Sequence, residues 1–475
     1  MGFLEQVENF IGKIDNFLGG YVLVFLLLGI GIYFTIRLGF VQFAKFGRSF
    51  KLMFGGIFNK EKSEGALSSF QALSTAVAAQ VGTGNIGGVA TAVTIGGPGA
   101  VLWMWITALL GMSTIFAEAV LAQFYRERTE DGELVGGPAF YIRKGVGAKS
   151  KGLAKFLAGF FAVAIIIALG FAGNMVQSNS ISAALNTSFG IPTWVVGLIL
   201  AIIAGLIFIG GIKRIGRFAE LVVPFMAIIY IITTIILLIK YGSNLGHAFG
   251  LIFEGAFTPQ AAVGGFAGAA VRQAIKLGVQ RGLFSNEAGM GSTPHAHAVA
   301  DVKHPGQQGL VAMAGVFIDT ILICSGTALA IVATGSYEAY EKGVTEGVGI
   351  TQLAFTRAFG NVGGAFLSIC LMFFAFTTIV GWYYFGESNV RYLFGKKGLL
   401  PYQILVLVFI FAGSLAQVSF VWTLNGFLNN LMVIPNVIAL AILSPLVVKI
   451  YKDYNKQYKL GHFDFKYDET RHTDL

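Results

Sequence analysis

Long apolar runs separated by short polar segments make up most of this chain, and the longest run is interrupted in its middle. The 53 residues from Gly65 to Ala117 include no charged side chain. Since about 20 apolar residues suffice to cross a bilayer, this run predicts membrane-spanning helices. It is broken by Gly82-Thr83-Gly84-Asn85-Ile86-Gly87-Gly88. Backbone that leaves a helix at membrane depth needs protein, water or a ligand for its polar groups, so the break predicts a binding site.

The same pattern predicts eleven spans, and the expected fold class is an all-α integral membrane protein. Composition agrees, because 55% of the residues are hydrophobic, 12% are charged and the mean hydropathy is +0.72. The N-terminus lacks a basic segment with a cleavage site, so the first apolar run is expected to be a retained helix. The predicted spans are 19–38, 68–95, 99–124, 153–186, 191–211, 216–240, 261–284, 307–335, 351–385, 401–418 and 421–448.

Positive charge falls in alternate loops. Lys and Arg gather in 37–62, in 126–155 and in the C-terminal tail, whereas 336–349 is acidic. The positive-inside rule then predicts a multi-pass plasma-membrane protein with the N-terminus outside and the C-terminus in the cytoplasm. The net charge of +9 is therefore no sign of nucleic-acid binding. Segment 39–62 fits an interfacial amphipathic helix or a plain basic loop equally well.

A second interrupted span is expected five spans after the first. Polar Arg272, Gln273, Lys276 and Gln280 lie within the predicted span 261–284. Two weak spans at corresponding places predict an inverted repeat of five plus five helices. The expected organisation is an N-terminal span and basic interfacial segment over 1–62, a first repeat over 63–240, a second repeat over 241–450 and a cytoplasmic tail over 451–475.

The glycine-rich break admits more than one interpretation. Gly82, Gly84 and Gly87 match the spacing of a dinucleotide-binding loop, but that loop needs a preceding strand. The glycines could instead only allow helices to pack closely. Polar Thr83 and Asn85 favour a binding role, in which free N–H groups and the positive end of the resumed helix take a carboxylate.

Oxygen atoms near the break could also surround a sodium ion, because hard cations take oxygen ligands. A second source of oxygen is the pair Thr377 and Thr378, which interrupts an aromatic run in span 351–385. These hydroxyls either complete a sodium site or bond back to their own helix. The candidate oxygens at the break are the carbonyls near Ala78, Gln80 and Val81 and the amide of Asn85.

Several other side chains are candidates for a ligand cavity. Trp382 follows Thr378 by four residues and so lies on the same helix face, where it could bound a small substrate. Asn174 and Gln177, close to Phe171, either line the cavity or form hydrogen bonds between helices.

Charged and metal-binding residue types give weaker indications. Glu118 and Asp319 lie at or within spans, so each is a proton site, a cation site or part of a buried structural pair. His295 and His297 have an H-x-H spacing that alone does not favour a metal site. The sequence shows no nucleophile with a base and no carboxylate pair, so an enzyme is not expected.

The segment Gly278-Val-Gln-Arg-Gly-Leu-Phe-Ser-Asn-Glu-Ala-Gly-Met-Gly-Ser-Thr-Pro294 closely resembles a signature of the alanine/glycine:cation symporter family. The runs 80–88 and 136–141 are similar to that family too, and the resemblance extends from about 20 to 450. It implies a leucine-transporter-like fold, with ten core helices in two inverted repeats and the helix 19–38 as an addition. It also implies sodium-coupled uptake of alanine and glycine, with Na⁺ as the coupling ion.

The resemblance also implies roles for particular residues. It assigns the hydroxyls of Thr377 and Thr378 to sodium, and it puts the second break at Lys276-Leu277-Gly278 with Gln273 one turn earlier. A lysine there departs from the neutral pattern of the wider fold, and Lys276 could instead line a cytoplasmic exit. The positions implied for substrate and ion at the first break are Gln80, Gly82, Thr83, Gly84 and Asn85.

The combined expectation is a symporter that carries one small zwitterionic amino acid inward with Na⁺, by alternating access around two broken helices. Its partners would be the amino acid, the ion and the lipid bilayer. Trp382, Phe171 and the backbone of the first break would leave room only for small substrates. A passive channel would need a continuous polar stripe or charged rings, and the sequence has neither.

Overall fold

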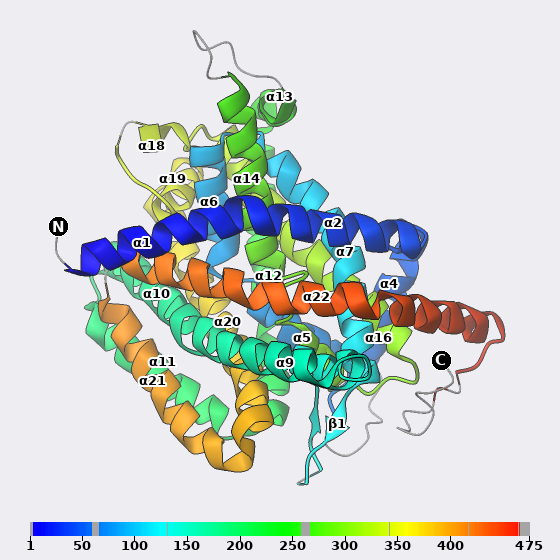
Figure 1. Cartoon of the computed structure of the whole chain (residues 1–475). Coiled ribbons are helices and arrows are strands. Elements are labelled where there is room, and N and C mark those ends of the chain that lie inside the picture. The colour runs from blue at the N-terminus through cyan, green and yellow to red at the C-terminus, as the bar shows by residue number, and fades with distance from the viewer. Residues whose placement is uncertain are drawn as a thin grey trace.

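The computed structural model is almost entirely helical, with one two-stranded hairpin (Figure 1). It describes residues 3–58, 66–130, 132–257, 267–341, 343–416, 418–463 and 465. The hairpin joins β1 (Glu127–Arg128) to β2 (Leu134–Val135) in antiparallel register. The expected all-α class therefore holds apart from this hairpin.

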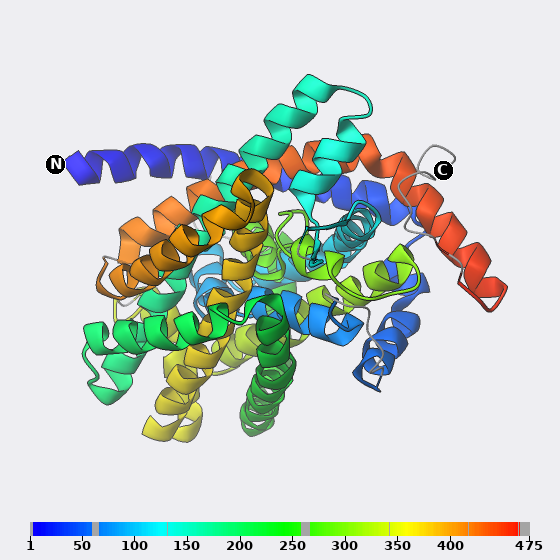
Figure 2. The ribbon, with the colours of Figure 1, turned by 90° about the horizontal axis from the view of Figure 1, so that it is seen from below.

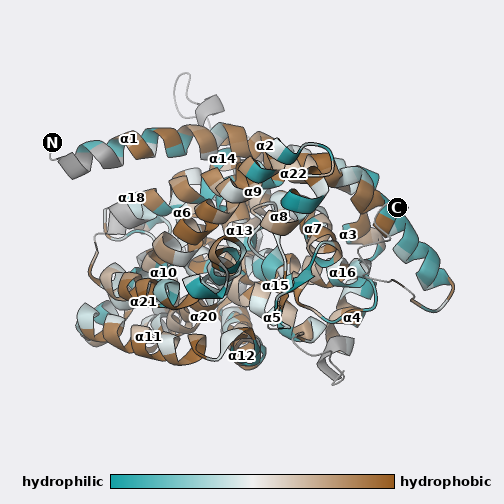
Figure 3. Cartoon of the chain, turned by 60° about the horizontal axis from the view of Figure 1, so that its bottom comes forward, coloured by the Kyte–Doolittle hydropathy of each residue, from teal (hydrophilic) through white to brown (hydrophobic). Residues whose placement is uncertain are grey.

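Seven helical stretches of the described chain are long and apolar enough to cross a membrane. Hydrophobic residues cover peripheral helices such as α11 (Thr193–Phe208) and α21 (Leu399–Leu415), whereas the last turns of α22 (Val418–Lys459) are hydrophilic (Figure 3). A helix that exposes apolar side chains outward is typical of contact with lipid. The seven stretches are Asn9–Arg37, Ala100–Phe124, Lys151–Phe189, Gly211–Lys240, Pro305–Ala333, Asn361–Leu415 and Trp422–Lys459.

The chain starts with a long helical stretch that lies beside α22. It comprises α1 (Phe3–Phe17), the π-helical segment η1 (Leu18–Val22) and α2 (Leu23–Arg37). Asn430 donates to Asp15 at 2.7 Å, and the hydroxyls of Tyr33 and Ser444 are 3.0 Å apart. The two long helices therefore run side by side in the same direction (Figures 1 and 2).

Segment 39–62 is helical over most of its length. A turn at Gly39 and Phe40, both with positive φ, leads into α3 (Val41–Ala44) and α4 (Phe46–Phe58). The helix interpretation is thus the better one here, and residues 59–62 lie outside the described residues.

The first predicted break is confirmed. Helix α5 (Ser69–Gln80) ends at Val81, which has extended backbone angles. The chain resumes as the π-helical segment η2 (Gly84–Gly88) and continues into α6 (Val89–Gly96). Every residue from Ala72 to Ala90 is buried, so the loosened backbone lies inside the protein.

The predicted position of the second break is wrong. Lys276, Leu277 and Gly278 lie in the uninterrupted helix α14 (Ala267–Asn286). The chain leaves the helix after Asn286 and resumes as α15 (Pro294–Ala298). Positive φ angles at Glu287, Gly289 and Gly291 show where the backbone turns, a conformation that glycine adopts without steric penalty.

Two further boundaries differ from the prediction. The expected span 351–385 is divided at Gly360, whose φ is +67°, into α19 (Val348–Phe359) and α20 (Asn361–Phe394). Helix α22 also extends to Lys459, beyond the predicted start of the tail at 451.

The remaining elements complete the two halves of the chain. In the first half they are α7 (Ala100–Phe124), α8 (Pro138–Tyr141), η3 (Ile142–Val146), α9 (Lys151–Ile165), η4 (Ile166–Gly173), α10 (Asn174–Phe189), α12 (Gly211–Lys240) and α13 (Gly242–Phe257). In the second half they are α16 (Pro305–Val316), η5 (Phe317–Cys324), α17 (Ser325–Ala333), α18 (Glu338–Glu341) and η6 (Gly395–Gly398).

A close contact between α5 and α20 sets the geometry of the first break. A Cβ added at Gly381 would lie 2.9 Å from the Cβ of Ala79 and 3.1 Å from its backbone, so only glycine allows this approach. The contact brings the preceding turn of α20, which carries Thr377 and Thr378, against the end of α5.

Candidate functional site

Thr378 lies at the centre of an oxygen cluster at the first break. Its hydroxyl oxygen is 3.0 Å from the carbonyl of Ala78, 3.1 Å from that of Val81 and 3.0 Å from that of Phe374. A hydroxyl has only one proton to donate, so at most one of these three carbonyls receives it. The other lone pairs face one another in a fully buried place, an arrangement that a small cation would stabilise.

Thr377 points elsewhere. Its hydroxyl donates to the carbonyl of Phe374 at 2.9 Å and lies 3.7 Å from the sulfur of Met226 on α12. Adjacent residues on a helix diverge by about 100°, so only one hydroxyl of the pair reaches the end of α5. The structure brings Ala78, Val81 and Thr378 together as predicted and leaves Thr377 outside that cluster.

Asn85 joins the first break to η5. Its Oδ1 accepts from the backbone N–H of Gly82 at 2.8 Å, and its Nδ2 donates to Oδ1 of Asp319 at 2.5 Å. The Asp319 carboxylate also accepts from the hydroxyls of Ser285, at 2.9 Å, and Thr320, at 2.7 Å. All three donors are neutral, and a buried carboxylate with only neutral donors is suited to receive a cation or a proton.

The free N–H groups expected at the first break are in fact occupied. Gly82 donates to the side chain of Asn85, and Thr83 donates to Oε1 of Gln177 on α10 at 3.2 Å. The amide oxygens of Asn85 and Gln177 thus hold the positions at which a substrate carboxylate could accept. Gln177 therefore lines the break.

Three buried side-chain oxygens at the first break and on the neighbouring helix α10 have no hydrogen-bond partner among the described residues. Oε1 of Gln80, Oγ1 of Thr83 and Oδ1 of Asn174 are buried and accept no hydrogen bond from the described residues. The amide nitrogen of Asn174 bonds back to Gly170 in its own helix. Buried acceptors without donors cost about 1–3 kcal/mol each, and an ammonium group supplies the donors they lack.

The ends of the two broken helices are tied to each other. Nε2 of Gln80, the last residue of α5, donates to the carbonyl of Asn286, the last residue of α14, at 2.6 Å. Leu67, just before α5, pairs with Ala300, just after α15, in an isolated parallel bridge. The two breaks therefore lie beside each other although about 200 residues separate them.

Glu118 on α7 supports the second break. Its two carboxylate oxygens accept from the backbone N–H groups of Gly289 and Gly291, each at 2.9 Å. Asn436 on α22 donates to the same carboxylate at 2.7 Å and also to the carbonyl of Gly289. Of the alternatives open from sequence, these contacts fit a buried structural group.

Trp382 bridges the second break and the end of η4, which leads directly into α10. Its Nε1 donates to Oε1 of Glu287 at 2.6 Å, and Ser292 donates to Oε2 of the same carboxylate. A Cβ added at Gly173 would lie 2.6 Å from the indole ring, so the ring packs directly on the helix that carries Gln177. The ring of Phe284 approaches Trp382 edge-on, with centroids 6.4 Å apart.

Four sequence candidates are not brought into this group. The ring of Phe171 stacks on Phe409 of α21, with centroids 4.8 Å apart. Lys276 donates to Asn16 of α1 at 3.2 Å, and Gly278 packs against the backbone of Ala100. Gln273 is half-buried one turn before Lys276 on α14.

The two histidines are structural. His295 bonds to the carbonyl of Ser292 and to Asn389, and His297 bonds to Gln308. In the part of the chain that the structure describes, no group of three or more His, Cys, Asp or Glu side chains could hold a metal ion.

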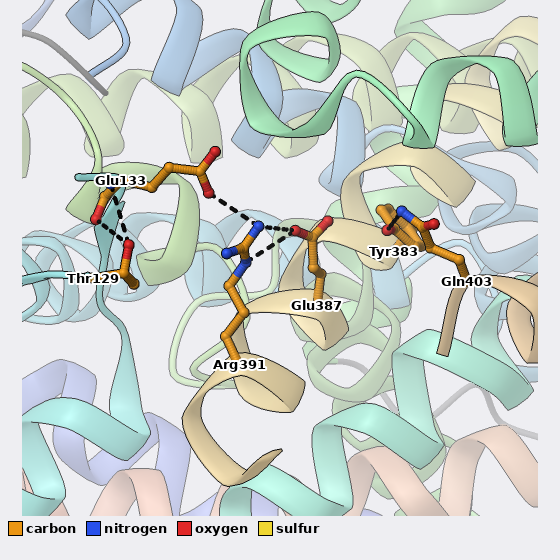
Figure 4. A network of polar contacts seen from close by, with 6 residues as sticks. All are labelled: Thr129, Glu133, Tyr383, Glu387, Arg391 and Gln403. Atoms are coloured by element: carbon orange, nitrogen blue, oxygen red, sulfur yellow. Dashed lines mark hydrogen bonds and ion pairs between the residues drawn. The ribbon is translucent and has the colours of Figure 1, made fainter. Parts of the chain in front are cut away.

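Arg391 links the hairpin to the C-terminal end of α20 (Figure 4). Arg391 pairs with Glu133, next to β2, at 3.0 Å and with Glu387, one turn earlier on α20, at 3.1 Å. The other oxygen of Glu387 is buried without a hydrogen-bond partner among the described residues. This network fixes the hairpin against the helix that carries Thr378.

Comparison with known proteins identifies the family to which this chain belongs. A model of the sodium:alanine symporter family matches residues 4–467. The sodium/alanine symporter AgcS of Methanococcus maripaludis is 44% identical, over 94% of this chain and 97% of its own. The relatives also include the following two proteins of Bacillus subtilis. The putative sodium/proton-dependent alanine carrier YrbD is 42% identical over 96% of this chain and 94% of its own, and the probable sodium/glutamine symporter GlnT is 39% identical over 96% and 93%. Because the family model and these relatives cover nearly its whole length, this chain belongs to the sodium:alanine symporter family, and it is a membrane transporter rather than an enzyme.

Proposed function

We propose that this protein carries small neutral amino acids, alanine and glycine, into the cell together with Na⁺. The observation that carries the proposal is the crowding of three carbonyls around the hydroxyl of Thr378, 3.0 to 3.1 Å away, at the end of a broken helix. Neutral oxygen ligands hold sodium firmly enough to bind and loosely enough to release. The ligands would be the carbonyls of Ala78, Val81 and Phe374 and the hydroxyl of Thr378.

The amino acid would bind next to the ion at the first break. Its carboxylate would replace the amide oxygens of Asn85 and Gln177 at the N–H groups of Gly82 and Thr83. Its ammonium group would donate to the unpartnered oxygens of Gln80 and Asn174. Trp382 and Phe284 would bound the space for the side chain, which favours alanine and glycine over larger residues.

The names of the relatives do not by themselves identify the substrate of this protein. AgcS is named for alanine and GlnT for glutamine, at similar identity to this chain. The size of the pocket then distinguishes alanine from glutamine as the substrate. The rings of Phe284 and Trp382, beside the proposed site, support a small substrate.

The proposed architecture is a leucine-transporter-like core of two inverted repeats, with eleven spans and α1–α2 as the addition. Besides the apolar stretches above, α11 and the two broken helices would cross the membrane, and α20 and α21 would cross separately. The tie between Gln80 and Asn286 supports two breaks that meet near the midplane. The charge of the loops supports an outer N-terminus and a cytoplasmic C-terminus. Alternating access would then move the two repeats around the shared site.

Uptake into proteoliposomes tests the proposed function. Labelled alanine should accumulate above its external concentration only when sodium is higher outside, and unlabelled glycine should compete. Equilibration that is independent of the gradient would indicate a channel. Accumulation driven equally well by a pH gradient without sodium would replace Na⁺ by H⁺ as the coupling ion.

Replacing Trp382 tests the boundary of the pocket. Trp382→Ala should let valine and leucine compete with alanine, because a methylene group in an apolar pocket is worth about 1–3 kcal/mol of discrimination. It also removes the donor to Glu287, so alanine binding should weaken. Trp382→Phe, which loses the donor but keeps a ring, should weaken alanine binding without admitting leucine. Competition against labelled alanine measures both, and an unchanged rank of competitors in the alanine variant would remove Trp382 from the pocket.

A further inference from the structure

A second polar cavity lies where the N-terminal helix, α14 and α22 meet, and it borders the second break at Met290. It has a volume of about 180 Å³, which corresponds to a few water molecules at about 30 Å³ each or to one small amino acid. Figure 1 shows α14 passing behind α1–α2, with α22 alongside. Asp15, Arg281, Asn425 and Asn429 line the cavity together with apolar side chains of α2 and α14.

The polar groups of this cavity have few partners in the protein. Asn425 is fully buried and Asn429 is 3% exposed, yet neither amide forms any hydrogen bond with the described residues. Nε of Arg281 is buried and unpartnered, and the guanidinium instead lies 5.8 Å from the ring of Trp422. Four buried amide atoms and a buried guanidinium nitrogen without partners would cost about 1–3 kcal/mol each if nothing filled the cavity.

The two charges of the cavity act on each other across it without forming a contact ion pair. Asp15 accepts from Asn430 at 2.7 Å and forms no ion pair with Arg281, although both side chains line the same space. A cation and an anion that line one space together with neutral amides match a ligand that carries both charges. A simple anion in the cavity would meet the like charge of Asp15, and a simple cation would meet the like charge of Arg281.

We propose that this cavity is a second binding site for a small zwitterionic amino acid, distinct from the site at the breaks. The carboxylate would accept from Arg281 and Asn425, the ammonium group would donate to Asp15 and Asn429, and a small side chain would face Leu23 and Leu283. The inference rests on the proposed function only for the chemical class of the ligand.

The cavity also has a route of entry. Arg281 and Trp422 belong to the walls of a wider cavity of about 560 Å³ as well, which is bordered by α6, α10 and residues 345–352. The cation–π contact between them therefore separates the two spaces. An amino acid in the wider cavity would enter the small one by displacing this pair.

Equilibrium binding without sodium tests the proposal. The full chain is purified in detergent, freed of amino acids and titrated with labelled alanine in N-methylglucamine buffer, where the proposed sodium-dependent site stays empty. We expect saturable binding of one alanine per chain, and a second alanine per chain once sodium is added. Arg281→Gln and Asn425→Leu should each weaken the sodium-free component about tenfold or more.

Control variants separate this site from the central one. Asn455→Leu, the same substitution on α22 outside the cavity, should leave both components unchanged. Thr378→Val should reduce only the sodium-dependent component, so a failure of the proposed function remains distinct from a failure of this inference. Asn425→Leu should not lower the unfolding temperature, because it removes a buried amide without partners.

Two results would overturn the proposal. Absence of sodium-free alanine binding in the parent would show that the cavity holds water only. Sodium-free binding that survives both Arg281→Gln and Asn425→Leu would place that alanine elsewhere.

Discussion

Replacing Glu118 by alanine should largely abolish folded protein. The carboxylate is fully buried and is the acceptor for the N–H groups of Gly289 and Gly291 and for the amide of Asn436. Each buried donor left without an acceptor costs about 1–3 kcal/mol. The summed loss is a large fraction of the stability of an ordinary protein, about 5–15 kcal/mol.

The unfolding temperature and the yield of monodisperse protein measure this effect. Glu118→Gln is the matched control, because it keeps one acceptor oxygen in the same place and should lose less stability than the alanine variant. If the alanine and glutamine variants unfold at the same temperature as the parent, Glu118 does not hold the second break.

Replacing Asn85 by leucine should remove alanine binding and also lower stability. Leucine cannot accept from the N–H of Gly82 or donate to Asp319, so it leaves a buried N–H and a buried carboxylate with fewer partners. The loosened backbone of the first break would then lose the side chain that fixes it. We expect alanine binding below detection at saturating sodium and a clearly lower unfolding temperature.

The control for this variant is Asn186→Leu, the same change at an exposed position of α10. It should bind alanine as the parent does. Normal sodium-dependent binding by Asn85→Leu would exclude Asn85 from the site, whatever happens to its stability.

The first break could be predicted from sequence because glycine and polar residues stand out in an uncharged apolar run. The oxygen set of Ala78, Val81 and Thr378 followed from the need for backbone carbonyls near the break, and the structure brings these three residues together. Sequence could not distinguish Thr378 from Thr377. That choice depends on the rotation of α20, which the close contact between Gly381 and Ala79 fixes.

Polar residues within the predicted span 261–284 do not mark the second break, because an intact helix carries them. The intact helix α14 accommodates Lys276 because it packs against the N-terminal helix, where Lys276 donates a hydrogen bond to Asn16. The real signal was the pair of glycines at 289 and 291, which turn the backbone with positive φ. Gly360 was a similar signal, since a glycine with positive φ commonly ends a helix.

Phe171 illustrates a different limit. On a regular helix Phe171 and Asn174, three residues apart, would share a face, but Phe171 lies in the π-helical segment η4, and its ring packs on α21 instead. Phe284, Ser285 and Glu287 were missed because their roles depend on where α14 ends. They all lie within the segment 278–294 that carries the family resemblance.

The sodium dependence of alanine binding in Thr378→Val and Thr377→Val tests the central claim most directly. Both substitutions keep the side-chain shape and remove one hydroxyl, but only that of Thr378 faces the carbonyls of Ala78 and Val81. Thr378→Val should raise the sodium concentration for half-maximal binding about tenfold or more, while saturating sodium largely restores alanine affinity. Thr377→Val should keep the sodium dependence of the parent. An unchanged sodium dependence in Thr378→Val, with alanine affinity lost at every sodium concentration, would contradict the assignment of this cluster to the ion.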